Sequence, residues 1–234
     1  MLVILGLLVG GIMSGQSLIR AAELRAVTTE YQRYVGATQT LRDKYFSLPG
    51  DMPNATAFWG RVGGGSGQCV TPATDTDTGT PTCNGDGSGR IDYLTHEQAR
   101  YWEHLAAAGL IEGNFSGIIT STPVTLVSPA SKLSNGHWRE VHYGHQADTS
   151  HPDFFVQEYG HMYLLTNING GVVLRPEEAW NIDTKLDDGR PASGRVWDGY
   201  RGTCTNSSSA TDYTASYLLS SSNIACAVIF SRLF

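Results

Sequence analysis

The most chemically suggestive stretch of the chain is a run of alternating glycines and oxygen-bearing side chains at positions 84–92, NGDGSGRID. Oxygens two residues apart along such a run can converge on one ion, while the glycines permit a sharp turn. Carboxylate, amide, hydroxyl and carbonyl oxygens are the ligands that Ca²⁺ takes in proteins. The sequence therefore predicts a structural calcium site. Its expected first ligands are Asn84, Asp86, Ser88, the Arg90 carbonyl and Asp92.

The spacing follows the start of an EF-hand calcium loop. Such a loop carries an acid at its twelfth position, but Thr95 stands there in this chain. Glu97, two residues further on, is the expected replacement, and Asp75 and Asp77 are further candidates. The alternative interpretation is a plain turn rich in Asn, Asp and Gly.

A second group of acids follows a predicted helix that opens at Pro176 and ends near Gly189. Acids are unfavourable at the negative end of a helix dipole, so these carboxylates need another partner. A second cation is one candidate, and salt bridges to Lys185, Arg190 and Arg195 are the other. The acids are Asp183, Asp187 and Asp188.

Five histidines between positions 137 and 161 match no metal-ligand spacing, and aromatic residues interleave with them. They are His137, His142, His145, His151 and His161. No nucleophile elbow, zinc-protease, phosphate-loop or dinucleotide fingerprint occurs, so we expect no enzymatic activity. The net charge is −6 and no basic stripe follows the first helix, so we expect no nucleic-acid partner.

Four cysteines fall into two local pairs, Cys69 with Cys83 and Cys204 with Cys226. Three connectivities exist for four cysteines. We favour the local pairing, because each pair closes an irregular polar loop that has few other ways to hold its shape. Free buried thiols are the alternative. Disulfides would place the protein in an oxidising compartment.

The elements that position these groups begin with one long helix. Positions 1–19 are almost wholly apolar, and from Arg20 apolar residues recur every three or four positions without a Pro until Pro49. This pattern predicts a helix of about 45 residues, roughly 65–70 Å long. Its first half, 1–19, must lie in lipid or among other helices, and its amphipathic half, 20–47, packs on a globular head of residues 48–234.

This N-terminal region, LVILGLLVGGIMSGQSLIRAAELRAVTTEYQRY followed by DKYFSLPGDMPNATAFWG, resembles that of type IV pilins and type II secretion pseudopilins. The later run NIDTKLDDGRPASGRV resembles a segment of large pilin-like proteins. The family also has a basic leader, a Gly cleavage point, a Phe and a Glu. This chain starts inside the apolar run, and we expect those residues to precede it.

The resemblance implies an α+β, type IV pilin-like fold: a long N-terminal helix packed on an antiparallel sheet, with short helices and disulfide-closed loops. It implies a structural subunit of an extracellular, cell-surface filament that rests in the inner membrane before pilus or secretion machinery assembles it with its own copies. The residues expected to pack in the filament core are Leu2, Val3, Leu5, Leu7, Leu8, Val9, Ile12, Met13, Leu18 and Ile19.

Several alternatives fit the same sequence. The chain would instead be a minor pseudopilin of a type II secretion system, an adhesin displayed on a pilus, or a membrane-anchored binding head that does not assemble. A plain membrane anchor or a signal peptide would also explain the apolar start.

Hydrophobic alternation and turn residues predict the remaining elements. A second helix is expected over 95–109. The expected strands are 118–127, 138–143, 154–158, 161–166, 172–174, 193–200, 213–219 and 224–230.

Overall fold

The computed structural model describes residues 2–60, 82–91, 96–117, 127–145 and 153–234, with the backbone alone for 2–11, 13, 96 and 141–145. Helix α1, Leu2–Tyr45, is 44 residues long, which corresponds to about 66 Å. It ends because Phe46 takes a left-handed backbone conformation (φ 54°) and Pro49 follows shortly. The predicted long helix is thus present.

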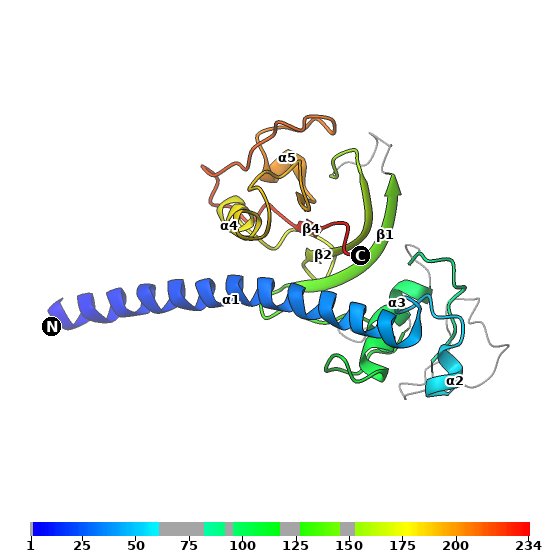
Figure 1. The fold of residues 1–234 in the computed structure, drawn as a ribbon. Helices are drawn as coiled ribbons and strands as arrows, with labels where there is room; N and C mark the ends of the chain where they lie inside the picture. The colour runs from blue at the N-terminus through cyan, green and yellow to red at the C-terminus, as the bar shows by residue number, and fades with distance from the viewer. Residues whose placement is uncertain (1, 61–81, 92–95, 118–126, 146–152) are drawn as a thin grey trace.

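The second half of α1 lies along the head through one stripe of side chains (Figure 1). Val27, Tyr34, Thr38 and Leu41 are at most 1% exposed, and Leu24, Tyr31 and Tyr45 pack beside them. These positions are three or four residues apart and therefore share one helix face. The predicted amphipathic stripe is confirmed. At its centre the Tyr34 ring meets Trp102, Trp138 and Tyr163 edge to face.

The head contains a four-stranded antiparallel sheet in the order β1-β2-β4-β3. Its strands are β1, His137–His145, β2, Glu158–Thr166, β3, Val196–Asp198, and β4, Val228–Phe230. One face packs on α1, and the other carries a second core that includes Phe155, Tyr159 and Trp197. The α+β class with an antiparallel sheet is therefore correct.

The head also contains four shorter helices: α2, Ala55–Trp59, α3, His96–Ala107, α4, Pro176–Leu186, and α5, Arg201–Cys204. Helix α3 begins one residue after the start of the predicted range 95–109 and ends two residues before its end, and Gly109 follows it with φ 72°. Helix α4 starts at the predicted Pro176 and ends three residues before Gly189. Helices α2 and α5 were not predicted, because runs of four or five residues carry no clear period.

Several predicted strands are wrong. Residues 154–157 and 213–219 are irregular, apart from a single bridge between Tyr217 and Thr205, and 172–174 contribute only the bridge Leu174↔Cys226. Their apolar side chains pack in the core without a ladder, since Phe154 and Phe155 are buried while the Val156 amide donates to the Ala210 carbonyl. The predicted strand 118–127 lies, except for its last residue, outside the described chain.

The first half of α1 extends away from the head (Figure 1). Of the expected filament-core residues, Ile12, Leu18 and Ile19 are 60%, 72% and 63% exposed. The side chains of the others, Leu2, Val3, Leu5, Leu7, Leu8, Val9 and Met13, lie outside the described set. Among the residues described, no helix combines the length and hydropathy that a bilayer span requires.

Candidate functional site

The seam where α1 meets the head begins at Arg20. Its Nε and Nη2 atoms donate to the two carboxylate oxygens of Glu178 at 2.6 and 2.7 Å. Glu178 also accepts the Arg175 amide at 2.9 Å and so closes the first turn of α4. Partial burial would raise the pKa of Glu178, but the hydrogen bonds from Arg20 and Arg175 outweigh it and hold that pKa below its usual value.

A buried carboxylate two and a half turns further on fixes the helix more firmly. Glu30 is 6% exposed and accepts hydrogen bonds from Ser131 Oγ, the Lys132 amide and Trp138 Nε1 at 2.6–2.8 Å. All three donors come from the segment that leads into β1 and from β1 itself. Arg20 and Glu30 together therefore set the direction in which the free half of α1 leaves the head.

The predicted calcium loop lies at the opposite end of α1. There the carboxylate oxygens of Asp51, Asp86 and Glu97 lie within 4.8 Å of one another. Asp86 and Glu97 belong to the predicted ligand set, and Asp51 comes from the turn after α1. The Glu97 carboxylate accepts the Asp86 amide at 3.0 Å, so the loop is drawn onto α3.

Asp51 is the most constrained member of this carboxylate cluster. It is 2% exposed, and its two oxygens accept the Ser88 and Gly89 amides at 2.9 and 2.8 Å. Burial raises its pKa to about 6 in spite of these amides, and a side-chain hydrogen bond with Asp86 adds to the rise. Asp86 is exposed, and its hydrogen bonds with Ser88 hold its pKa below the usual value.

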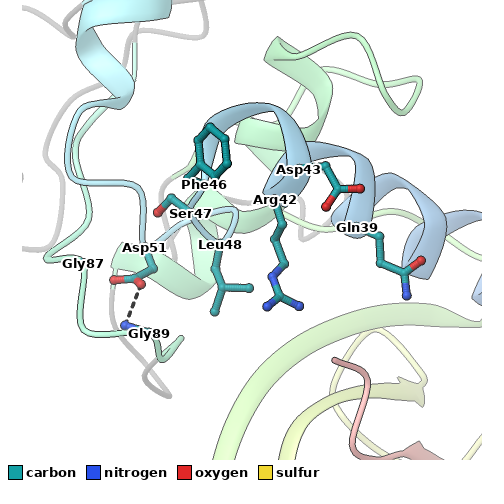
Figure 2. A pocket seen from close by; sticks show the side chains of 9 residues that line it. All are labelled: Gln39, Arg42, Asp43, Phe46, Ser47, Leu48, Asp51, Gly87 and Gly89. Carbon is teal, nitrogen blue, oxygen red and sulfur yellow. Dashed lines mark hydrogen bonds between the residues drawn. The ribbon is translucent and has the colours of Figure 1, made fainter.

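A cavity of about 550 Å³ borders Asp51 (Figure 2). The last turn of α1 forms one wall and the calcium-loop glycines form another. Figure 2 shows the Asp51 carboxylate bonded to the Gly89 amide at this cavity's edge. The lining residues are Gln39, Arg42, Asp43, Phe46, Ser47, Leu48, Asp51, Gly87 and Gly89.

The other predicted ligands make different hydrogen bonds or lie outside the described residues. The Asn84 side-chain oxygen accepts the Thr56 amide at 2.9 Å, at the start of α2. Ser88 contributes its amide to Asp51 and Asp86. No contact of the Arg90 carbonyl is described, and Asp92 lies outside the described residues, as do Asp75 and Asp77. Calcium stays a prediction, and Asp51 joins Asp86 and Glu97 as a candidate ligand that no local sequence pattern indicated.

Behind the cluster lies a buried pair, Glu140 on β1 and His161 on β2. Glu140 is 0% exposed, and one oxygen lies 3.3 Å from His161 Nδ1. Burial, with the nearby charge of Glu97, raises the pKa of Glu140 far above its usual value. Burial lowers the pKa of His161, whose Nε2 lies 3.2 Å from the Gly89 carbonyl. Both shifts favour the neutral forms of these two side chains.

The second acid group, Asp183, Asp187 and Asp188, accepts hydrogen bonds mainly from main-chain amides. Asp183 accepts the Tyr217 hydroxyl at 2.9 Å and the Gly189 amide at 3.1 Å. Asp187 accepts the Arg195 and Val196 amides, and Asp188 accepts the Arg190 amide and the Ser193 hydroxyl. The expected partners were the side chains of Lys185, Arg190 and Arg195. Main-chain amides are used instead, because the acids stand where the chain turns back after α4.

The Cys204–Cys226 disulfide is present, with 4.9 Å between its Cα atoms. It joins α5 to the segment before β4, and both cysteines are 0% exposed. The Cys69–Cys83 pairing stays a prediction, because Cys69 lies outside the described residues. Asp198, also 0% exposed, lies beside the Cys204–Cys226 bond, and burial raises its pKa far above its usual value.

No family model, no curated protein and no solved structure matches this chain.

Proposed function

We propose that this chain is a structural subunit of a type IV pilus-like extracellular filament that assembles through the first half of α1. The observation that carries the proposal is the course of this helix. It continues for about 27 Å beyond Arg20, where its described contacts with the head begin, and Ile12, Leu18 and Ile19 are exposed there.

The physical reason is the cost of leaving this surface in water. Burying apolar surface is favourable by about 25 cal/mol per Å². The free half cannot fold back on its own head, because α1 runs unbroken from Leu2 to Tyr45 and Arg20 and Glu30 hold its direction. The apolar side chains of the free half are therefore buried in lipid or against the same segment of other copies.

Copies of such a rod meet along different surfaces of each molecule, and a contact of this kind builds an open helical array. Glycines at positions 6, 10, 11 and 15 would allow the helices of neighbouring copies to approach closely. In this proposal the unassembled subunit rests in the inner membrane, and pilus or secretion machinery transfers it into the filament.

A charge on the free half tests the proposal. Leu18→Asp would place a carboxylate in the filament core, whereas Leu219→Asp alters a leucine on the head that is 52% exposed. We expect cells that carry Leu18→Asp to lose surface filaments and cells that carry Leu219→Asp to keep them. Electron microscopy of the native cell, with mass spectrometry of the sheared filaments, measures both.

The alternatives give different results in the same cells. Absence of filaments of this chain together with loss of protein secretion on deletion would indicate a minor pseudopilin. Filaments made chiefly of another subunit, with this chain at their tip and cell binding lost on deletion, would indicate an adhesin. Filaments that persist with Leu18→Asp would contradict assembly through α1.

A further inference from the structure

Three strands end at the same edge of the sheet. Val196, the first residue of β3, pairs with Phe230, the last residue of β4. The Ser231 amide then donates to the Arg195 carbonyl at 2.8 Å, and the Arg232 amide donates to the Tyr159 carbonyl at 3.0 Å. Antiparallel pairing therefore places the side chains just outside β2, β3 and β4 together, although they are far apart in the sequence.

A cavity of about 460 Å³ opens at this edge. Each strand contributes one polar side chain from just beyond its end: Gln157 before β2, Arg195 before β3 and Arg232 after β4. Its apolar lining includes Trp197, which is 4% exposed, and Tyr213, which is 46% exposed. The lining therefore combines polar side chains with two aromatic rings.

The polar side chains at the three strand ends are donors that have no acceptor. Within the described chain, neither the Arg195 nor the Arg232 guanidinium has a hydrogen bond or ion pair, and both side chains are exposed. The Gln157 side-chain nitrogen is shielded from solvent and also has no partner among the described residues. Asp187 and Asp188, which bind the backbone around Arg195, already accept hydrogen bonds from main-chain amides and from the Ser193 hydroxyl.

The backbone at this edge is held in an unusual conformation. Arg232 has φ 53°, in the left-handed region that costs a non-glycine residue about 1–2 kcal/mol. Its neighbours Ser231 and Leu233 are buried, and its amide bond to Tyr159 holds the turn. The tertiary structure thus keeps this arginine at the cavity mouth against its local preference.

We propose that this cavity binds a carboxylate carried on a ring. The guanidinium fork matches a carboxylate in a two-point arrangement, and a second guanidinium supplies further donors. The exposed Tyr213 ring offers a flat apolar face to the body of the ligand. Two kinds of molecule share this chemistry, an acidic sugar and an aromatic acid. Filament assembly needs neither, so the binding site is independent of the proposed function.

The test uses the full chain in mild detergent, with titration calorimetry at low salt. The probes are glucuronate and benzoate, with glucose and benzyl alcohol as their neutral counterparts. We expect saturable binding of one carboxylate with a dissociation constant of about 1 mM or below, and binding of its neutral counterpart at least about tenfold weaker. Binding of glucuronate identifies the ligand as an acidic sugar, and binding of benzoate identifies it as an aromatic acid.

Variants locate the site. Arg195→Gln with Arg232→Gln should weaken binding at least about tenfold, because both charged donors are lost. Arg190→Gln, an exposed arginine outside the lining, should leave binding unchanged. Circular dichroism melting of each variant verifies that it is folded. The proposal is overturned if neither carboxylate binds up to about 20 mM, or if the double variant binds as tightly as the parent chain.

Discussion

The carboxylate of Glu30, on the buried face of α1, accepts a hydrogen bond from the indole nitrogen of Trp138 on β1, with 2.8 Å between Oε2 and Nε1. The same carboxylate accepts the Ser131 hydroxyl and the Lys132 amide. A carboxylate has four acceptor positions, whereas an amide has two and presents N–H groups with the other atom. Only a carboxylate at position 30 can therefore accept all three of the hydrogen bonds that join α1 to β1 and to the segment before it.

Glu30→Gln should lower the free energy of unfolding by about 1–3 kcal/mol, because it turns an amide N–H₂ toward buried donors. Urea unfolding in mild detergent, followed by Trp fluorescence, measures the change. Glu177→Gln, an exposed glutamate on α4, is the matched control and should change stability by less than about 0.5 kcal/mol. Equal effects of the two substitutions would show that the Glu30 contacts contribute little.

Calcium should stabilise the head through the carboxylate cluster. With a dissociation constant of about 1 mM, 10 mM Ca²⁺ would raise the free energy of unfolding by about 1.4 kcal/mol. Asp86→Asn should abolish this increment, and Asp188→Asn should retain it, because Asp188 lies outside the carboxylate cluster of Asp51, Asp86 and Glu97. Thermal melting with Ca²⁺ and with Mg²⁺ measures the response. The same response to both ions, or in both variants, would sink the calcium prediction.

Asp183 should make stability fall as pH rises. Burial, helped by Asp188 and Asp187, raises its pKa to about 7. Between about pH 4 and 7 the folded state holds a proton that the unfolded state has released, so stability falls by up to about 1.4 kcal/mol per pH unit. This contribution is complete at low pH and is lost as the pH passes the folded-state pKa.

Asp183→Asn removes that titration while keeping an acceptor for the Gly189 amide. The loss of stability from pH 5 to pH 8 should therefore be smaller in the variant by about 2–4 kcal/mol. Urea unfolding at both pH values measures it, with Asp43→Asn, an exposed acid on α1, as the control. A pH dependence that matches the parent chain would show that Asp183 is ionised in the folded state throughout this range.

Glycine should be the favoured residue at the C-terminal ends of two helices, because both positions have a positive φ. Phe46 terminates α1 with φ 54° and is 93% exposed, and Gly109 terminates α3 with φ 72°. Phe46→Gly should leave stability unchanged or raise it by up to about 1 kcal/mol, and Gly109→Ala should lower it by about 1 kcal/mol. Thermal melting compares them. A marked loss for Phe46→Gly would mean that the exposed ring makes a stabilising contact.

The long helix and its buried stripe were readable because a regular period is a local property of the sequence. Val27, Tyr34 and Leu41 recur at whole turns of an α-helix, and nothing between them breaks the backbone. The strands were harder to predict. The aromatic pair Phe154 and Phe155 is equally at home in a strand and in an irregular buried segment, and only its partners decide between them.

The candidate cation site could also be predicted only in part, because some of its residues are far apart in the sequence. Asp86 and Glu97 were identified because they lie in one loop and just after it, but Asp51 is 35 positions before Asp86 and belongs to no local pattern. Asn84, two positions from Asp86, was expected beside it and instead holds the start of α2. Spacing along a loop predicts only which oxygens are close in the sequence. The path of the chain after α1 decides which oxygens come close in space, and it places Asp51 beside Asp86 and Glu97.

The sequence by itself determined that this protein has a long helix with an apolar first half, an α+β head and a local disulfide between Cys204 and Cys226. Periodicity and turn residues are encoded within a few residues of one another, and the Cys204–Cys226 loop closes over only 22 positions. Only the tertiary structure decided that Arg20 binds Glu178, that Glu30 binds Trp138, and that Arg195 and Arg232 share one cavity. These relationships join segments far apart in the chain, so they depend on how α1 and the strands pack into one core and not on any local pattern.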